Sequence, residues 1–165
     1  MGKEIERKYL LDAFPAEELQ GEGITVQSTQ TIYQTYLAYA GKEEIRVRMI
    51  ENEQGERTYT HTFKSGHGMV REEIEYAISG EIYEQLLRNA NLTPLMKVRT
   101  TVDYQGTILE IDDYKQVELT VVEVEFPDLA AADYFMAPAW FGRELGAEDE
   151  YRNKTLWLKM QHGNN

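Results

Sequence analysis

The chain has 165 residues, of which 42% are hydrophobic and 28% charged, a composition typical of one globular domain over residues 1–165. Its 29 acidic and 17 basic residues give a formal charge of −12, which argues against a general nucleic-acid or acidic-membrane surface. Cysteine is absent, which excludes disulfides and thiolate metal sites. No segment is long and apolar enough for a membrane span, and the first residues lack the apolar centre of a secretory signal, so we expect a cytoplasmic protein.

Eight segments alternate polar and apolar residues with the period of two that indicates β-strands. They are residues 3–10, 31–39, 44–50, 57–64, 70–78, 95–103, 107–114 and 117–126. Glycine-containing turns at 52–55, 65–68 and 105–106 suit short hairpin connections. Consecutive strands joined in this way pair antiparallel.

Helical signals are fewer. Ser79 is a candidate N-cap for a helix to about residue 91, and Asp128 for one to about residue 136. The tail at 151–162 has helical spacing, and residues 15–20 suit a short helical turn. The sequence therefore predicts a mainly β, α+β domain in which a few helices cover part of the sheet.

Seven of the predicted strands carry formal charges on one face and apolar residues on the other. The first is EIERKYL at residues 4–10, where Glu4, Glu6 and Lys8 share a face. The other charged faces carry, in chain order, Arg46 and Arg48; Lys64; Arg71, Glu73 and Glu75; Lys97 and Arg99; Glu110 and Asp112; and Glu123 and Glu125. For any single strand, the default interpretation is that such a face points to water.

Three features of these faces favour a barrel interior that holds ions instead. Like charges recur two residues apart, where they repel unless something of opposite sign lies between them. Acidic and basic pairs come from different strands, so a closed sheet would segregate them. The faces also carry almost only formal charges, and few Ser, Thr, Asn or Gln residues. In such a barrel the apolar residues point outward, and Tyr9, Tyr76, Tyr104 and Tyr114 would lie partly exposed.

This arrangement indicates a particular chemistry. Carboxylates from several strands form an oxygen-only site, which suits Mg²⁺ or Mn²⁺. Arginine and lysine side chains supply charge-assisted donors for phosphate oxygens. Together the two sets indicate metal-assisted phosphoryl transfer.

The ordered motifs resemble the CYTH family, also called triphosphate tunnel metalloenzymes. The motifs are E-x-E-x-K at 4–8, R-V-R at 46–48, Lys64 before a glycine turn, R-E-E-I-E at 71–75, K-V-R at 97–99, E-I-D at 110–112 and E-V-E at 123–125. E-x-E-x-K alone occurs by chance in many acidic chains, whereas the ordered set, over residues 4–158, is specific. The resemblance implies an eight-stranded antiparallel β-barrel that forms a tunnel, is open at both ends and binds a triphosphate.

The resemblance also implies a role for each charged residue. The residues expected to hold the principal metal are Glu4, Glu6, Glu123 and Glu125. Those expected to support a second metal or orient water are Asp112, Glu110, Glu73 and Glu75, which makes Glu6, Asp112, Glu73 and Glu75 the candidate catalytic residues. The residues expected to bind phosphate oxygens are Lys8, Arg46, Arg48, Lys64, Lys97 and Arg99. Arg71 is ambiguous, with a structural ion pair to nearby glutamates as the alternative, and Lys154 is a further candidate on the C-terminal helix.

The implied activity is divalent-metal-dependent hydrolysis of a triphosphate, with inorganic triphosphate as the leading substrate and Mg²⁺ or Mn²⁺ as cofactor. The alternatives are a thiamine or nucleoside triphosphatase, an adenylate cyclase, and a non-catalytic polyphosphate- or nucleotide-binding module. Cyclase members carry a His-Phe pair a few residues before E-x-E-x-K, and the residues before Glu4 lack it, which disfavours the cyclase. The full set of carboxylates favours catalysis over binding alone. These patterns specify neither the physiological triphosphate nor a homo-oligomer.

Overall fold

The computed structural model describes residues 2–66, 69–90, 92–146 and 151–163. Its long strands are β1 (Gly2–Leu11), β2 (Ile24–Ala40), β3 (Glu43–Glu51), β4 (Arg57–Ser65), β5 (Val70–Ala77), β6 (Leu95–Tyr104), β7 (Thr107–Tyr114) and β8 (Leu119–Glu125). The remaining elements are a 3₁₀ turn, η1 (Glu18–Gln20), the helices α1 (Gly80–Ala90), α2 (Leu129–Tyr134) and α3 (Asn153–Gly163), and the two-residue strand β9 (Glu144–Leu145).

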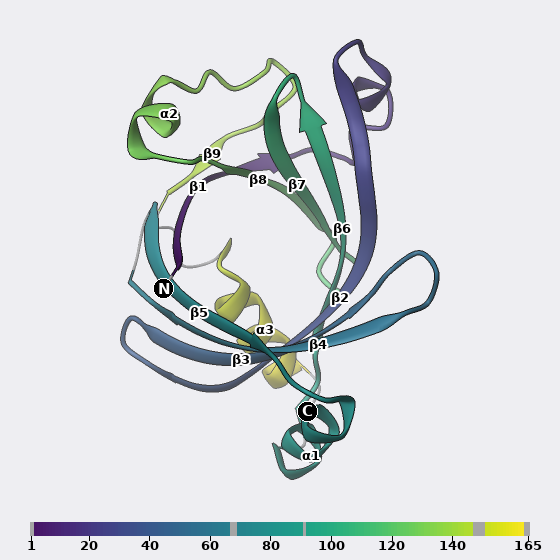
Figure 1. Cartoon of the computed structure of the whole chain (residues 1–165), viewed down its shortest axis with the longest axis vertical. Helices are drawn as coiled ribbons and strands as arrows, with labels where there is room; N and C mark the ends of the chain where they lie inside the picture. The colour runs from purple at the N-terminus through teal and green to yellow at the C-terminus, as the bar shows by residue number, and fades with distance from the viewer. Residues whose placement is uncertain (1, 67–68, 91, 147–150, 164–165) are drawn as a thin grey trace.

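The sheet closes on itself as a barrel (Figure 1). Its strand order is β5-β4-β3-β2-β6-β7-β8-β1, and β1 also pairs with β5, which joins the two ends of the sheet. The pairings are antiparallel throughout. β9 adds to β1 at Lys8 and Tyr9. The predicted eight-stranded antiparallel barrel is therefore confirmed.

The main difference from the predicted strands is in β2, which begins at Ile24 and not near residue 31. Polar residues fill positions 27–31, and the pairing with β6 shifts register between Val26 and Ser28. A shift of this kind breaks the alternation on which the prediction depended. β9 went unpredicted because two residues carry no period.

The two predicted helix caps are present. The Ser79 hydroxyl accepts a hydrogen bond from the Ile82 amide at 3.1 Å, and the Asp128 carboxylate accepts one from the Ala131 amide at 2.8 Å. The first helix was predicted to reach residue 91, which lies outside the described residues. The described part of the first helix reaches Ala90, and the second helix ends slightly earlier than expected, at Tyr134. No described helix is long and apolar enough to cross a membrane.

One apolar core lies outside the barrel, between the strands and the segment that includes α2. Tyr9 packs there against Phe135 and Phe141, at ring-centroid distances of 6.3 and 4.9 Å. Tyr9 is consequently 3% exposed, so the expectation that it is partly exposed is wrong. Tyr76, by contrast, is 53% exposed. The segment covers Tyr9 because the outward faces of β1, β7 and β8 are apolar and need a second layer.

A second core lies at one end of the barrel, where α3 packs on inward-facing apolar side chains. Leu156 and Trp157 of α3 pack with Tyr36, Leu95 and Val121. Seen along the barrel, α3 lies within the outline of the strands (Figure 1). The sequence did not predict that a helix packs against inward-facing side chains at this end of the barrel. The inward faces change there from charged to apolar residues, and burying those residues stabilises the contact with the helix.

Tyr114 also belongs to this inner face. It is opposite Lys97 in the strand register, is 1% exposed, and its hydroxyl donates a hydrogen bond to Asn153 at the start of α3. The expectation of a partly exposed, outward Tyr114 is therefore wrong. Its spacing of two from Asp112 already placed it on the charged face.

Candidate active site

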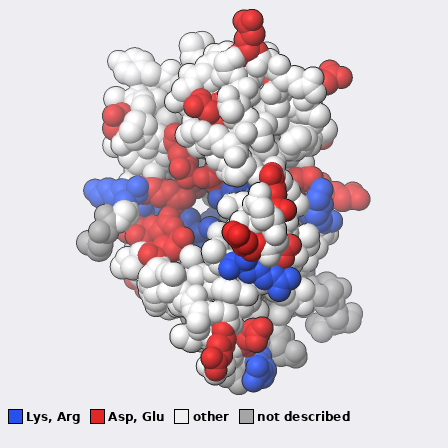
Figure 2. Space-filling model, turned by 45° about the vertical axis from the view of Figure 1, so that its right-hand side comes forward, with Lys and Arg blue, Asp and Glu red and all other residues white. Residues whose placement is uncertain are grey.

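The barrel contains a cavity of about 540 Å³ that is lined mainly by charged side chains. Acidic and basic residues gather around a hollow in the middle of the molecule (Figure 2). The predicted site residues among its lining are Glu4, Glu6, Lys8, Arg46, Arg48, Lys64, Glu73, Glu75, Lys97, Arg99, Glu110, Glu123 and Glu125. Asp112 is the one predicted site residue outside this lining.

Strand register brings the carboxylates together. Glu6 of β1 is directly opposite Glu125 of β8, and Glu123 is directly opposite Glu110 of β7. Side chains in such pairs lie about 5 Å apart on the same face. One carboxylate oxygen each from Glu4, Glu6 and Glu125 lies within 4.8 Å of the others. A single small cation would therefore reach all three.

The chemistry of this triplet fits a divalent ion. One carboxylate oxygen of Glu6 is buried and has no hydrogen-bond partner among the described residues. Burial, together with the nearby Glu123 and Glu4, raises the pKa of Glu6 well above its usual range. A bound cation would offset this repulsion, and three carboxylates are the hard oxygen ligands that Mg²⁺ and Mn²⁺ prefer.

Lys64 is the cation closest to this triplet. Its Nζ lies 2.7 Å from a Glu4 oxygen and 3.8 Å from a Glu73 oxygen. Burial works to raise the pKa of Glu4, but the ion pair with Lys64 outweighs it and holds that pKa below its usual range. At Glu73 burial prevails over the attraction of Lys64 and raises the pKa to about 7. Glu75 accepts a hydrogen bond from the Thr62 hydroxyl at 3.0 Å.

The basic part of the lining has unused donors. The Nε atoms of Arg46 and Arg48 are buried and find no hydrogen-bond acceptor in the described parts of the chain. Burial lowers the pKa of Arg48 to about 10, and the nearby Arg46 and Arg99 act in the same direction. Cations crowded in this way, with donors left over, favour an anion of high charge.

Asp112 lies behind the basic residues of the lining and accepts hydrogen bonds from two of them. Its two oxygens accept from Lys97 Nζ at 2.8 Å and from Arg99 Nε and Nη2 at 2.7 and 2.8 Å. Asp112 is fully buried. Burial works to raise its pKa, but Arg99 and Lys97 outweigh that effect and hold the pKa below its usual range. Arg99 also forms an ion pair with Glu110.

Glu123 lies between two cations. Its carboxylate is 3.8 Å from Lys8 Nζ and 3.7 Å from Arg99 Nη2. Lys8 also donates to the Tyr151 carbonyl oxygen at 3.0 Å, which ties β1 to the segment before α3. Lys154, the further candidate on the C-terminal helix, lines the cavity and lies over the Tyr39 ring.

Lining residues that were not predicted from the sequence include Tyr36, Glu44 and Arg152, and Gln34 lies beside them. Gln34 links Tyr36 to Arg48: its Nε2 donates to the Tyr36 oxygen at 2.8 Å, and its Oε1 accepts from Arg48 at 3.2 Å. Tyr36 lines the cavity, as do Glu44 and Arg152. Gln34 and Tyr36 are neutral, so a search for formal charges passed over them. Glu44, however, shares a face with Arg46 and Arg48 by the period of two, and that signal was available.

A closed antiparallel barrel with carboxylates and buried cations around one cavity defines a class of proteins, those built to bind a polyanion together with a metal. The CYTH domain family matches residues 2–153. The chain belongs to the CYTH family, as the ordered motifs indicated.

Two relatives match nearly the whole chain. The inorganic triphosphatase of Nitrosomonas europaea is 32% identical over 164 residues, which cover 95% of this chain and 98% of that protein. The inorganic triphosphatase of Acetivibrio thermocellus is 30% identical over 159 residues, which cover 94% of each. A crystal structure of an inorganic triphosphatase superposes with a TM-score of 0.62 at 30% identity, over 96% of both chains. A Pyrococcus horikoshii protein shares the fold at 17% identity, with a TM-score of 0.61 over 79% of this chain and 82% of that one.

Proposed function

We propose that this protein is a divalent-metal-dependent triphosphatase that hydrolyses inorganic triphosphate to pyrophosphate and phosphate. The observation that carries the proposal is the content of one cavity: the carboxylate triplet of Glu4, Glu6 and Glu125 shares it with Arg46 and Arg48, whose buried Nε atoms are unpaired within the described residues. Carboxylates alone suit a metal and cations alone suit a phosphate, whereas both together suit a metal-bound polyphosphate. The names of the two relatives support inorganic triphosphate as the substrate.

In this proposal different residues of the chain bind the metal, bind the substrate and activate the attacking water. A divalent ion bound by the carboxylate triplet would neutralise the charge that develops on the phosphate oxygens. The residues that hold the substrate oxygens are Lys8, Arg46, Arg48, Lys64, Lys97 and Arg99. A water molecule attacks the terminal phosphorus, and the bond to the leaving pyrophosphate oxygen breaks. Glu73, whose pKa burial raises to about 7, accepts the proton of that water, and Glu75 beside it on β5 helps to orient the water.

Two of the other acidic residues, Asp112 and Glu123, are placed to hold cations of the cavity lining. Both oxygens of Asp112 are engaged by Lys97 and Arg99, so we assign Asp112 to fixing these cations and not to a metal. Glu123 contacts Lys8 and Arg99 and orders them in the same way. Glu110, paired with Arg99, lies opposite Glu123 and is the remaining candidate for a second metal.

A substrate panel tests the proposed function. Phosphate release would be measured with inorganic triphosphate, thiamine triphosphate, ATP and GTP, each with Mg²⁺, with Mn²⁺ and with a chelator. We expect metal-dependent release that is fastest with inorganic triphosphate. Faster release from a nucleoside or thiamine triphosphate would overturn the substrate assignment, and cyclic AMP would indicate a cyclase. Tight binding without release would indicate a binding module. A cytoplasmic location stays a prediction.

Metal binding should become tighter as pH rises from about 6 to about 8. Glu6 and Glu73 have pKa values above those of ordinary carboxyls, so they retain protons near neutral pH that a metal must displace. Fewer protons remain to be displaced at higher pH, which strengthens binding. Calorimetric titration with Mg²⁺ in buffers of different ionisation enthalpy would count the released protons. Affinity that does not change with pH would contradict the expectation, and Glu73→Gln should reduce the number of protons released.

A further inference from the structure

Glu44 is a buried carboxylate on the cavity wall that the proposed reaction does not use. It is 3% exposed and shares the inward face of β3 with Arg46 and Arg48. One of its oxygens lies 3.1 Å from Arg71 Nη2 and the other lies 4.0 Å from Arg152 Nη2. Glu44 therefore joins β3 to β5 and to the residue that precedes α3.

The strand register makes this pairing unexpected. Across the sheet, Glu44 is directly opposite Lys64, and Arg71 is directly opposite Glu4. Directly opposite side chains are the nearest partners on a face. The observed ion pairs are the reverse: Lys64 contacts Glu4 at 2.7 Å, and Arg71 contacts Glu44. Lys64 keeps a contact with its other register neighbour, Glu73, at 3.8 Å, but Glu44 and Glu4 have exchanged the cations that lie opposite them.

The exchange matters for the metal site. Glu4 belongs to the carboxylate triplet, and Arg71 is its register neighbour. Lys64 already contacts one Glu4 oxygen at 2.7 Å, so a guanidinium directed at Glu4 as well would compete with a metal ion for the other oxygen. Instead, Arg71 forms an ion pair with the Glu44 carboxylate, at 3.1 Å from Nη2, and its Nε donates a hydrogen bond to the Gly66 carbonyl oxygen at 3.1 Å.

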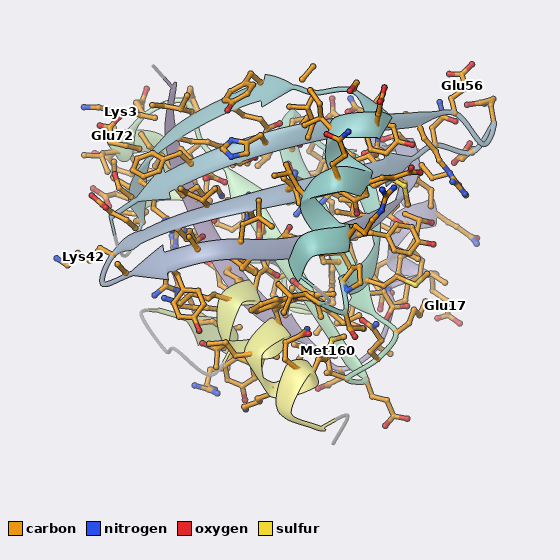
Figure 3. All side chains as sticks on the ribbon, turned by 90° about the horizontal axis from the view of Figure 1, so that it is seen from below. Lys3, Glu17, Lys42, Glu56, Glu72 and Met160 are labelled. Carbon is orange, nitrogen blue, oxygen red and sulfur yellow. The ribbon has the colours of Figure 1, made fainter. Side chains whose placement is uncertain are left out.

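The position of Glu44 in the barrel agrees with this role. Lys42, two residues before Glu44, lies on the same side of the molecule as Lys3 and Glu72 (Figure 3). Lys3 precedes Glu4 in β1, and Glu72 follows Arg71 in β5. The ion pair of Glu44 with Arg71 brings its carboxylate to the part of the barrel where β1 and β5 pair. It is the carboxylate that Arg71 contacts in preference to Glu4.

We propose that Glu44 is a positioning residue that keeps Arg71 off the metal carboxylate Glu4 and directs it along the cavity wall. The inference rests on the proposed metal-dependent function, because it concerns the affinity of the carboxylate triplet for a divalent ion. Glu44 itself contacts neither metal nor phosphate in this role. Without it, Arg71 turns to its register neighbour Glu4, and the triplet binds a cation less well.

Direct Mn²⁺ binding, measured by electron paramagnetic resonance without substrate, tests this role. Glu44→Gln should weaken Mn²⁺ binding by about fivefold, the size of a typical coupling between neighbouring charges. Adding Arg71→Gln in the same chain should restore the affinity, because the competing guanidinium is gone. Glu43→Gln is the matched control: it makes the same chemical change one residue earlier, at an exposed position, and should leave Mn²⁺ binding unchanged.

Two results would overturn the role of Glu44. One is a Glu44→Gln protein that binds Mn²⁺ as tightly as the Glu43→Gln protein. The other is a double variant that binds as weakly as Glu44→Gln alone, which would mean that Glu44 does not act through Arg71. If Glu44→Gln fails to fold, Glu44→Asp carries the same test, since it keeps the charge but withdraws the carboxylate from Arg71. An unmodified protein that neither binds Mn²⁺ nor hydrolyses triphosphate would instead refute the proposed function.

Discussion

Replacing Glu6 with glutamine is expected to reduce metal-dependent hydrolysis of inorganic triphosphate by about 100- to 1,000-fold. The substitution keeps the size of the side chain but removes the charge and one strong ligand from the triplet of Glu4, Glu6 and Glu125. A weakly held metal would no longer neutralise the phosphate oxygens in the transition state. The measurement is kcat/KM for phosphate release over a range of Mg²⁺ and Mn²⁺ concentrations.

The control for this experiment is Glu72→Gln. Glu72 is exposed on β5 and points away from the cavity, so its substitution makes the same chemical change outside the site. We expect the Glu72→Gln protein to keep its activity. The Glu6→Gln protein should also keep its thermal stability, because it loses a buried carboxylate that other carboxylates repel. Full metal-dependent activity in Glu6→Gln would show that the metal assignment is wrong.

Replacing Asp112 with alanine is expected to lower the free energy of unfolding by about 3–5 kcal/mol. The change leaves Lys97 and Arg99 without the fully buried carboxylate that accepts from both of them. Urea denaturation followed by circular dichroism would measure the loss. Because ion pairing holds the pKa of Asp112 below its usual range, the contribution is present above the pKa of the unfolded chain and is lost as pH falls below it.

The neighbouring residue provides the control. Asp113 pairs with Lys115, whose side chain is 53% exposed, on the outer side of the same strand. Asp113→Ala should change the free energy of unfolding by less than about 1 kcal/mol, as is usual for exposed ion pairs. Equal losses in the two variants would refute the assignment of Asp112 as the buried counter-ion of Lys97 and Arg99.

Much of the fold was accessible from the sequence because the relevant signal is local. In a strand, side chains alternate between faces, so the charged face of residues 4–8 and its counterparts could be read residue by residue. The hairpin turns then implied antiparallel order, and the ordered motifs indicated the family. The signal failed where alternation failed, at the start of β2, where a register shift separates Val26 from Ser28.

Most residues of the candidate site were predicted from the sequence, but the ion pairs between them were not. The period of two identified Arg71 and Lys64 as charges on inward faces, but it contains no information about which strand lies beside which. Pairing depends on register and on closure of the barrel, both of which are set by contacts between distant parts of the chain. The exchange in which Lys64 contacts Glu4 and Arg71 contacts Glu44 therefore appears only in three dimensions.

The sequence by itself determined the charged interior, the antiparallel barrel and the family, because each follows from local alternation or from the order of motifs along the chain. The tertiary structure alone decided that α3 covers one end of the barrel, that Asp112 lies behind the cavity wall, and that Glu44 holds Arg71. The physical reason is that the energy of a buried charge depends on the groups that surround it in space, and strand closure brings those groups from remote positions in the sequence.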